Sequence, residues 1–337
     1  MDISKLEEVL KNEPKYRLKQ AREAVFKNFI SDWKEATSFP KELREKLNKE
    51  CPLEIKADVL VSKKENSVKA KITLKDDLKI ESVLMRHADG RNTVCVSSQV
   101  GCPLGCLFCA TGKMGFKRNL TSDEIIEQVI FFNRYLKKEN LKVTNVTFMG
   151  MGEPFLNYDN VVKAIKILNN KDYFNISARS ISVSTAGIIE GIKRFSQDLP
   201  QCNLAISLHA PNDELRRYLM PIDKKYPLPA VLKAVDEYIK RTHRKVMFEY
   251  VLIKDINDSD EHGRQLANLM SKKLYFLNLI LYNPIGVFAR GGPKLSPTKR
   301  IERFKTILAK NKINFVQRYR FGDDIQAACG QFAIREE

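Results

Sequence analysis

Three closely spaced cysteines are the strongest chemical signal in the chain. The stretch "GCPLGCLFC" places thiols at Cys102, Cys106 and Cys109, a C-x3-C-x2-C spacing, and the next cysteine along the chain is Cys202. A zinc ion would need a fourth ligand, and the nearest histidine in the sequence, His87, lies on the far side of a predicted strand. A 4Fe–4S cluster is the favoured interpretation, because three cysteine ligands leave one iron open to a small molecule.

Glycines surround this triplet. Gly101, Gly105 and Gly112 carry no Cβ, so the backbone can wrap closely around a bulky inorganic group. The alternative that stays open at this point is a basic RNA-binding protein with a structural zinc site and no enzymatic activity.

Composition indicates a globular protein that meets a polyanion. With 43% hydrophobic residues among 337, the chain can bury a sizeable core. Its 58 lysines and arginines exceed its 41 acidic residues, and the net charge of +17 suggests RNA, DNA or an acidic membrane as a partner. The lysines are dispersed, so a composition bias without a polyanionic partner is the alternative.

The N-terminus and the cysteine usage predict a compartment. The stretch "MDISKLEEVLKNEPKYRLK" is charged from its start, and the chain has no apolar run long enough to span a bilayer. These features predict no signal peptide and no membrane association, hence a cytoplasmic protein. In that compartment seven cysteines serve as ligands or catalysts rather than as a disulfide framework.

Residues 1–88 differ in pattern from the rest and are predicted to form an accessory domain. Apolar residues first recur at helical spacing, with Pro14 and Pro40 as breakers. The stretch from "KADVLV" to "IESVLM" then alternates apolar and polar residues. The pattern predicts helices followed by a small antiparallel sheet, whose lysines are candidate RNA contacts.

Residues 89–337 alternate predicted strands and helices, which indicates a parallel sheet with right-handed crossovers. One helix is predicted to start at a capping box formed by Thr121 and Glu124. The fold class is therefore α/β, as a barrel or an open sheet. The predicted strands are "TVCVSS", "VTNVTFMG", "SISVST", "NLAISL", "VMFEYVLI", "FLNLILYN" and "NFVQRY".

Candidate functional residues follow these strands. The cysteine triplet follows "TVCVSS", "GMGEP" follows "VTNVTF", and "STAG" ends "SISV". "SLHAP" and "YNP" end two later strands. Since chemistry in parallel β/α folds lies at the C-terminal ends of the strands, these motifs are predicted to form one site.

Together the motifs resemble the radical S-adenosylmethionine (SAM) superfamily, which shares the cysteine triplet and a "GGEP" strand end. Within it, the chain resembles the family of rRNA adenine methyltransferases that contains RlmN and Cfr, and is most like RlmN. The resemblance implies a partial (β/α)6 TIM-like barrel with a small N-terminal α+β accessory domain. It is carried, from Leu78 to Phe332, by "CVSSQVGC", "CATG", "MGFKRNLT", "FMGMGEP", "AISLHAPND", "LMPI", "YNP" and "GDDIQAACGQ".

The resemblance also implies cofactors and their ligands. A 4Fe–4S cluster would be held by Cys102, Cys106 and Cys109, and SAM, two per turnover, would bind the open iron through its amino and carboxylate groups. By itself His209 would be interpreted as an ordinary buried histidine at a strand end. The implied SAM contacts are Gly152, Glu153, Ser184, Ser207, Leu208, His209 and Asn283.

Two further cysteines gain a role from the resemblance alone. By composition Cys329, in "AACGQ", and Cys95, inside a strand, would be inert or structural. The family pattern implies that Cys329 carries a methyl group as S-methylcysteine and that Cys95 later forms a disulfide with it. Glu81 matches the family's acidic proton acceptor, with a one-residue insertion before Cys95. Cys51 and Cys202 match no family position and are predicted to be structural.

The implied activity is methylation of RNA through a 5′-deoxyadenosyl radical. Its target would be C2 of adenine 2503 in 23S rRNA, and C2 of adenine 37 in tRNAs; the alternative is Cfr-type methylation at C8 of the same rRNA adenine. Arg318 and Arg320 are predicted phosphate contacts, because arginine binds phosphate bidentately. The expected partners are 23S rRNA, tRNA and an electron donor such as flavodoxin or ferredoxin, and the chain is expected to be a monomer.

Anaerobic analysis of iron and acid-labile sulfide separates the two metal interpretations. A cluster-bearing protein is expected to be brown, to bleach in air and to contain both elements, because its irons are bridged by sulfide. Cys102→Ala, which removes one ligand, is expected to lose most of the iron. A colourless protein that contains zinc and no sulfide would contradict the cluster interpretation.

Overall fold

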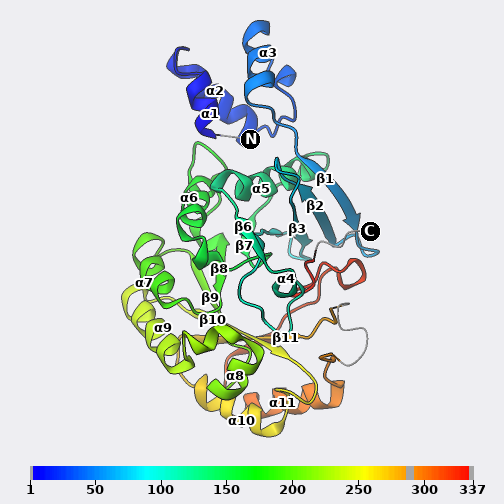
Figure 1. Ribbon diagram of the computed structural model, residues 1–337, viewed down its shortest axis with the longest axis vertical. Coiled ribbons are helices and arrows are strands. Elements are labelled where there is room, and N and C mark those ends of the chain that lie inside the picture. The colour runs from blue at the N-terminus through cyan, green and yellow to red at the C-terminus, as the bar shows by residue number, and fades with distance from the viewer. Residues whose placement is uncertain (1–2, 286–291, 334–337) are drawn as a thin grey trace.

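The computed structural model describes residues 3–285 and 292–333. A group of short helices forms the first unit and stands beyond the rest of the molecule (Figure 1). Trp33 is fully buried and donates from Nε1 to the carbonyl oxygen of Cys51 at 2.8 Å. The helices predicted here are present: α1 (Ile3–Val9), α2 (Lys15–Phe26), the 3-10 turn η1 (Trp33–Glu35) and α3 (Lys41–Glu50).

Antiparallel strands follow these helices. They are β1 (Lys56–Val61), β2 (Ser67–Thr73), β3 (Lys79–Arg86) and β4 (Asn92–Cys95), paired in chain order. The alternation predicted an antiparallel sheet over β1 to β3, but not that this sheet continues into the barrel: β4 pairs antiparallel with β3 and in parallel with β7. The antiparallel strands therefore extend the barrel sheet and cover what would be its exposed edge. A domain boundary at residue 88 stays a prediction.

The parallel part of the sheet carries the β/α repeat, and each strand lies where the sequence predicted it. Neighbouring strands run parallel from β4 to β12. Beyond β4 the order is β7 (Asn145–Phe148), β8 (Ile181–Thr185), β9 (Asn203–Ser207), β10 (Val246–Leu252), β11 (Tyr275–Leu281) and β12 (Phe315–Gln317).

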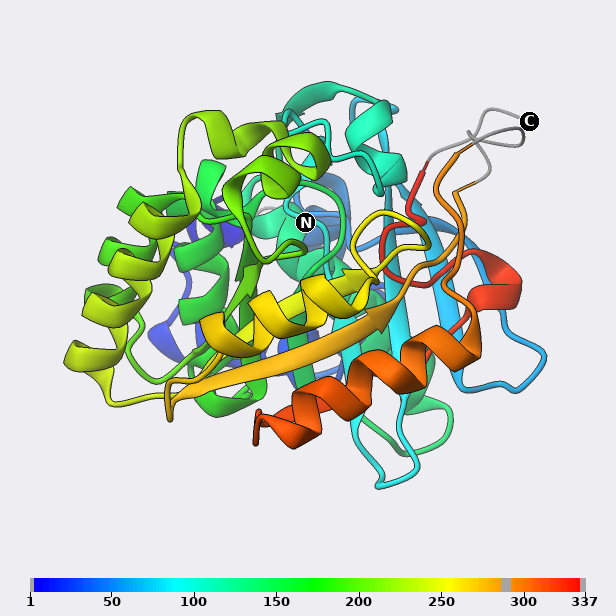
Figure 2. The same cartoon turned by 90° about the horizontal axis from the view of Figure 1, so that it is seen from below.

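Helices connect these strands along the outer side of the curved sheet (Figure 1). Contacts join α10 and α11, which lie on either side of β11 in the view from below (Figure 2). No helix within the described ranges is long and apolar enough to cross a membrane. The connecting helices are α5 (Ser122–Lys137), α6 (Tyr158–Asn169), α7 (Ile189–Asp198), α8 (Asp213–Leu219), α9 (Leu228–Thr242), α10 (Asp260–Leu269) and α11 (Thr298–Lys310).

The result is the predicted partial (β/α)6 barrel. Strand order follows chain order through the parallel part of the sheet. The outer strands of the whole sheet are β1 and β12. Within the described residues these two do not pair with each other, so the barrel is open along one side. That opening leaves room for the end of the chain.

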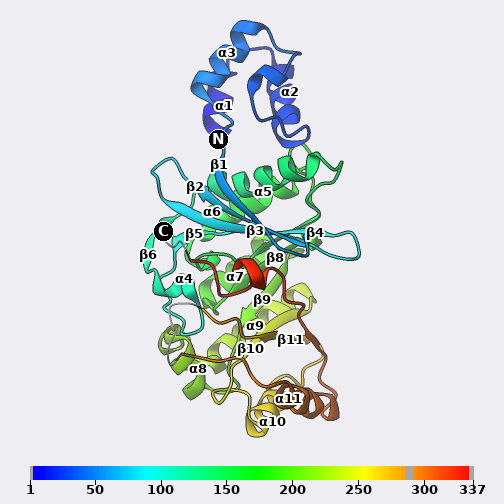
Figure 3. The ribbon, with the colours of Figure 1, turned by 90° about the vertical axis from the view of Figure 1, so that its right-hand side faces the viewer.

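After β12 the chain runs back toward the first strands. The segment from η6 (Asp323–Ile325) onward lies beside β2 and β3 (Figure 3). Gly322 permits this close approach: its φ is +60°, and a Cβ there would lie 2.8 Å from the Cβ of Ala327 and 3.2 Å from the Cβ of Ser67. The C-terminal segment therefore packs against β2.

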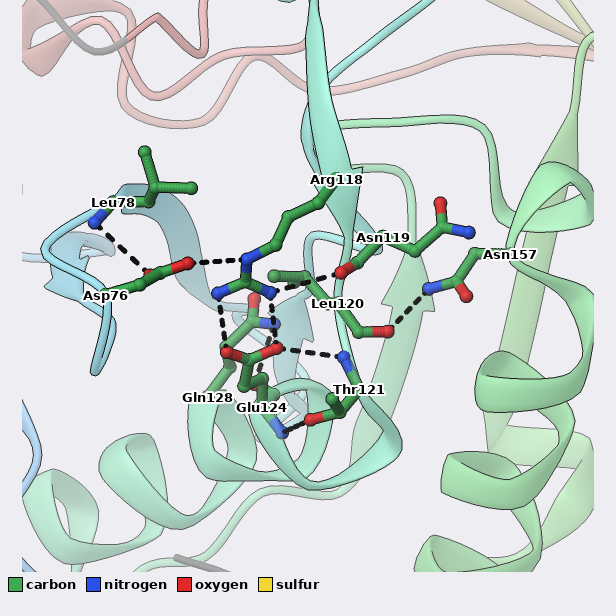
Figure 4. A network of polar contacts seen from close by, with 9 residues as sticks. All are labelled: Asp76, Leu78, Arg118, Asn119, Leu120, Thr121, Glu124, Gln128 and Asn157. Atoms are coloured by element: carbon green, nitrogen blue, oxygen red, sulfur yellow. Dashed lines mark hydrogen bonds and ion pairs between the residues drawn. The ribbon is translucent and has the colours of Figure 1, made fainter.

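A small hairpin holds the cysteine loop. β5 (Gln99–Gly101) pairs with β6 (Phe116–Asn119), and α4 (Ala110–Lys113) lies between them. The sequence analysis did not predict this hairpin, because strands this short show no alternation. Arg118 anchors it (Figure 4): Nε donates to Asp76 at 2.7 Å, and the two terminal nitrogens donate to Glu124 at 2.9 and 2.8 Å.

The capping box predicted at the start of α5 belongs to the same network. Oγ1 of Thr121 accepts from the N–H of Glu124 at 3.2 Å, and the Glu124 carboxylate accepts from the N–H of Thr121 at 2.9 Å. Asn157, after β7, donates to the carbonyl oxygens of Leu120 and Ser98 at 2.7 and 2.8 Å. The cysteine hairpin is therefore tied to the β2–β3 turn, to α5 and to the residue that precedes α6 (Figure 4).

Replacement of Arg118 tests this anchor. Arg118→Leu is expected to lower the free energy of unfolding by about 1 kcal/mol, because two partly exposed carboxylates lose one shared partner. Urea denaturation measures the change, and Lys117→Leu on the exposed side of the same strand is the matched control. The difference is expected to shrink at high salt. Equal losses in both variants would contradict the anchor.

Candidate functional site

A close backbone contact shapes the cysteine loop. Gly101 has a φ of +74°, and a Cβ there would lie 1.8 Å from the carbonyl oxygen of Gly115. The N–H of Cys102 donates to the same oxygen at 2.9 Å. This contact closes the hairpin beneath the loop, and Cys109 at the other end of the loop begins α4.

All three thiols line one cavity of about 160 Å³, here called the cluster cavity, at the C-terminal ends of the barrel strands. Burial raises the pKa of Cys102 to about 12, and it also raises the pKa values of Cys106 and Cys109. Charge on Cys109 adds to the rise for each of the other two. A bound cation would supply the positive charge that holds them as thiolates.

The donor set fits a 4Fe–4S cluster. Within residues 3–285 and 292–333, no group of three or more His, Cys, Asp or Glu side chains is placed to hold a metal ion. In a cluster each cysteine binds a different iron, so the three thiols can lie farther apart than the ligands of a single zinc ion. His87 does not join the cysteines: it lines another cavity, and its Nε2 lies 3.0 Å from Oγ1 of Thr93.

Glu153 lies just after β7 with both carboxylate oxygens bonded. Oε1 accepts from the N–H of Phe155 at 3.0 Å, and Oε2 accepts from the N–H of Ala186 at 2.7 Å. Burial raises the pKa of Glu153 to about 7, and the N–H donors oppose that rise. An ammonium group against this carboxylate would lower its pKa and keep it ionised. The environment therefore suits the predicted contact with the SAM amino group.

Gly152 permits a close approach to β5. Its φ is +97°, and a Cβ there would lie 2.5 Å from the Cβ of Gln99. Gln99 accepts from the N–H of Glu153 at 2.9 Å and donates to Oδ1 of Asn119 at 2.8 Å. Gln99 thus positions the strand end that carries Glu153. Gln99 lies in the motif "CVSSQVGC", but the sequence alone assigned this residue no role.

Ser184, Ser207 and His209 line the cluster cavity from the ends of β8 and β9. The two serine Oγ atoms are 3.5 Å apart. Nδ1 of His209 accepts from the N–H of Val251 at 3.1 Å, so the proton of the neutral ring is on Nε2. Burial, with help from the charge on Arg216, lowers the pKa of His209 to about 3. The ring therefore stays neutral and offers one N–H donor.

Leu208 and Asn283, the two remaining predicted SAM contacts, have side chains that contact the protein itself. Leu208 does not line the cluster cavity: its side chain is buried in the core, and its N–H donates to the carbonyl oxygen of Glu249 at 3.0 Å. Asn283 does line it, but its side chain holds the protein itself. Nδ2 donates to the carbonyl oxygen of Cys329 at 3.1 Å, and Oδ1 accepts from Nε of Arg320 at 2.9 Å.

Cys329 lies at the junction of two cavities. A second cavity of about 530 Å³, here called the barrel cavity, is lined by Cys95, by Arg318 and by inward-facing residues of the strands. Cys329 is exposed and lines both cavities. Burial raises the pKa of Cys95 to about 12, and the charge on Cys329 adds to the rise. The two thiols, distant in sequence, are therefore brought together as the resemblance implies.

Glu81 lines neither of these two cavities. It is buried on β3, two residues before Val83, which pairs with Cys95. Oε1 pairs with Nζ of Lys69 at 2.8 Å, and Oε2 accepts from the N–H of Ala333 at 2.9 Å. Burial raises the pKa of Glu81 while Lys69 opposes the rise, and a raised carboxyl pKa suits a proton acceptor.

The two arginines predicted to contact phosphate are engaged within the protein. A terminal nitrogen of Arg318 lies 3.4 Å from Oε2 of Glu249 and 3.3 Å from Sδ of Met149, and its charge lowers the pKa of Cys95. Arg320 donates to Asn283. Arg318 thus lies beside the thiols, and contact of either side chain with phosphate stays a prediction.

A buried arginine was missed by the sequence analysis. Arg216 on α8 is fully buried, pairs with Asp223 at 2.7 Å, and donates to the carbonyl oxygens of Ala186 and Ser207 at 2.6 and 3.4 Å. It thereby holds the ends of β8 and β9 together. The stretch "DELRRYL" contains two adjacent arginines, and no local pattern tells the buried one from its exposed neighbour.

Comparison with known proteins identifies the class of enzyme to which this chain belongs. The family model described as Radical SAM superfamily matches residues 96–266, which run from the end of β4 into α10 and include the cysteine loop. The crystal structure of a radical SAM methyltransferase from Sphaerobacter thermophilus superposes with a TM-score of 0.93 at 39% identity, covering 98% of this chain and 97% of that one. The fold and the site are those of a radical SAM methyltransferase.

Curated relatives then narrow the class. A probable dual-specificity RNA methyltransferase RlmN 2 from Protochlamydia amoebophila is 42% identical and covers 99% of this chain and 94% of its own. A probable dual-specificity RNA methyltransferase RlmN from Carboxydothermus hydrogenoformans is 44% identical over 96% of this chain and 93% of its own. The chain belongs to the RlmN family of radical SAM RNA methyltransferases. It is a SAM-dependent enzyme whose cofactors are a 4Fe–4S cluster and SAM.

Glycine substitutions test the geometry of the cysteine loop. Gly101→Ala is expected to lose most of the bound iron, because the new methyl group would displace the carbonyl of Gly115 and with it Cys102. Gly90→Ala is the matched control, since its φ is also positive, at +85°, but nothing lies within 4 Å of a Cβ there. Iron per chain after anaerobic reconstitution measures the difference. Full iron content in Gly101→Ala would contradict the proposed closure of the hairpin.

Proposed function

We propose that this enzyme methylates C2 of adenine 2503 in 23S rRNA and C2 of adenine 37 in tRNAs. The observation that carries the proposal is the position of Cys329, exposed at the junction of the cluster cavity and the barrel cavity. A thiol there can receive a methyl group on one side and present it to a base on the other. The names of the curated relatives, dual-specificity RNA methyltransferases, support two kinds of RNA substrate.

The cluster cavity has the groups that would bind SAM. Cys102, Cys106 and Cys109 would hold the cluster, which when bound supplies the electron that cleaves SAM to a 5′-deoxyadenosyl radical. The carboxylate of Glu153 would accept from the SAM ammonium, and the Nε2–H of His209 would donate to a polar atom of SAM. Burial of both side chains strengthens these contacts, because a low local dielectric makes a hydrogen bond stronger than it is in water.

Cys329 would be the methyl carrier. Carbon 2 of adenine lies between two ring nitrogens and is too electron-poor to attack a sulfonium methyl, whereas a thiolate attacks it readily. Cys329 would therefore take a methyl group from a first SAM, whose thioether leaves. The S-methyl group of Cys329 would then lose a hydrogen atom to the radical that a second SAM supplies, and its methylene carbon would add to C2. Arg318 lines both cavities together with Cys329, and its charge lowers the pKa of Cys95.

Cys95 and Glu81 would complete the reaction. The RNA is now bonded to Cys329 through the methylene carbon, so release requires loss of the C2 proton and cleavage of the carbon–sulfur bond. Glu81 would take the proton. The unpaired electron left by radical addition would pass to the oxidised cluster. Cys95 would then give up its proton and attack the sulfur of Cys329, so that the disulfide forms, the carbon–sulfur bond breaks and the released carbon takes a proton to become the methyl group. A reductant must open the disulfide before the next cycle. Burial of Cys95 keeps its thiol neutral until that step.

The remaining partners follow from this chemistry and from charge. An electron donor such as flavodoxin or ferredoxin would reduce the cluster, and a net charge of +17 favours the approach of RNA. We propose that the enzyme acts as a monomer in the cytoplasm.

Nucleoside mass spectrometry tests the proposal. Wild-type enzyme with RNA, SAM and a reductant is expected to give 2-methyladenosine, and Cys329→Ala is expected to give none, because the methyl carrier is gone. Cys202→Ala, which removes a buried thiol away from both cavities, is the control and is expected to retain the activity. Formation of 8-methyladenosine without the 2-methyl isomer would overturn the assignment of C2, and full activity of Cys329→Ala would overturn the carrier.

A further inference from the structure

One buried ion pair contacts the chain on both sides of Cys329. Nζ of Lys69 lies 2.8 Å from Oε1 of Glu81 and donates to the carbonyl oxygen of Gln326 at 3.3 Å. Oε2 of Glu81 accepts from the N–H of Ala333 at 2.9 Å. Gln326 precedes Cys329 by three residues and Ala333 follows it by four. The pair and its two main-chain contacts are here called the clasp.

The clasp comes from the antiparallel strands and not from the barrel. Lys69 is on β2 and Glu81 is on β3, two neighbouring strands that precede the cysteine loop. Their side chains are only 9% and 3% exposed, and both contact the C-terminal segment. A buried charge is costly unless it is paired and hydrogen-bonded, so both charges depend on the closed position of that segment.

Other hydrogen bonds also hold the C-terminal segment, but each of them restrains it at one residue only. Oδ2 of Asp324 accepts from the N–H of Lys63 at 2.8 Å, and the carbonyl oxygen of Phe332 accepts from Oγ1 of Thr111 at 2.6 Å. Each of these involves one flank of Cys329. The clasp differs because one pair of charges restrains both flanks, so loss of Lys69 loosens the segment before Cys329 directly and the segment after it through Glu81.

We propose that Lys69 is a positioning residue for Cys329: through the clasp it holds the methyl-carrying thiol at the junction of the cluster cavity and the barrel cavity. The chemical consequence rests on the proposed function, since only a methyl carrier needs that position. That Lys69 holds the C-terminal segment in place does not depend on the proposed function. Lys69 touches neither SAM nor RNA in this account, and it acts only by fixing the segment and Glu81.

Hydrogen–deuterium exchange tests the clasp without use of the reaction. Lys69→Met removes the charge and keeps the chain length, so exchange of the amides in 323–333 is expected to rise by on the order of tenfold, while peptides from β8 and β9 keep their wild-type rates. Lys69→Arg, which retains two donors, is expected to restore protection. Lys75→Met on the exposed turn after β2 removes the same charge and is expected to change nothing.

A double variant covers the case in which Lys69→Met fails to fold because Glu81 is left charged. Lys69→Met/Glu81→Gln removes both charges, and the amide oxygen of the new side chain can still accept from Ala333. Exchange is therefore expected to rise before Cys329, in 323–328, and to stay near the wild-type rate after it. Wild-type protection on both sides in this variant, or in a folded Lys69→Met, would overturn the clasp.

Single-turnover kinetics separate positioning from a general loss of structure. In Lys69→Met the rate of methyl transfer to Cys329 is expected to fall on the order of 10- to 100-fold while the dissociation constant of SAM is unchanged, because the thiol and not the SAM site is displaced. Equal changes in both quantities would contradict a positioning role. If exchange rises as expected but Cys329 is never methylated even in the wild type, the clasp stands and the proposed function fails.

Discussion

Two hydrogen bonds between the cysteine loop and the C-terminal segment are the contacts on which the site depends. The N–H of Ala110 donates to the carbonyl oxygen of Gly330 at 2.8 Å, and Thr111 donates to Phe332 across 221 residues of chain. They place Cys329 against the loop that begins the barrel. The contact is available because the barrel is open between its outer strands, so the end of the chain can cross the gap and bring a thiol to the edge of the cluster cavity.

Burial gives the site its electrostatic character. It raises the pKa values of Cys102 and Cys95 to about 12 and of Glu153 to about 7, and it lowers that of His209 to about 3. Each shift favours the neutral form of its group. At the cysteine loop a bound cluster would supply the positive charge that favours thiolates, and at Cys95 the charge of Arg318 opposes the effect of burial.

Rigid polar contacts position the main chain around this site. Gln99 holds the N–H of Glu153, Arg216 holds the carbonyl oxygens of Ala186 and Ser207, and Asn283 holds the carbonyl oxygen of Cys329. None of these side chains performs chemistry in the mechanism. Each fixes a strand end or a loop that does, which is how motifs from separate strands come to line one cavity.

The sequence by itself determined the parallel strands, the capping box at Thr121 and the glycine-rich cysteine loop, because periodicity, caps and ligand spacing are local properties of a chain. It pointed to Cys329 and Cys95 only through family resemblance, since a lone cysteine has no local pattern. The tertiary structure alone decided that Lys69 and Arg216 are buried and that Arg318 turns toward the thiols. Lys69 alternates with Val68 and Ala70, which predicts a solvated face. A segment more than 250 residues later covers it, and no local pattern encodes which distant segment will lie over a strand.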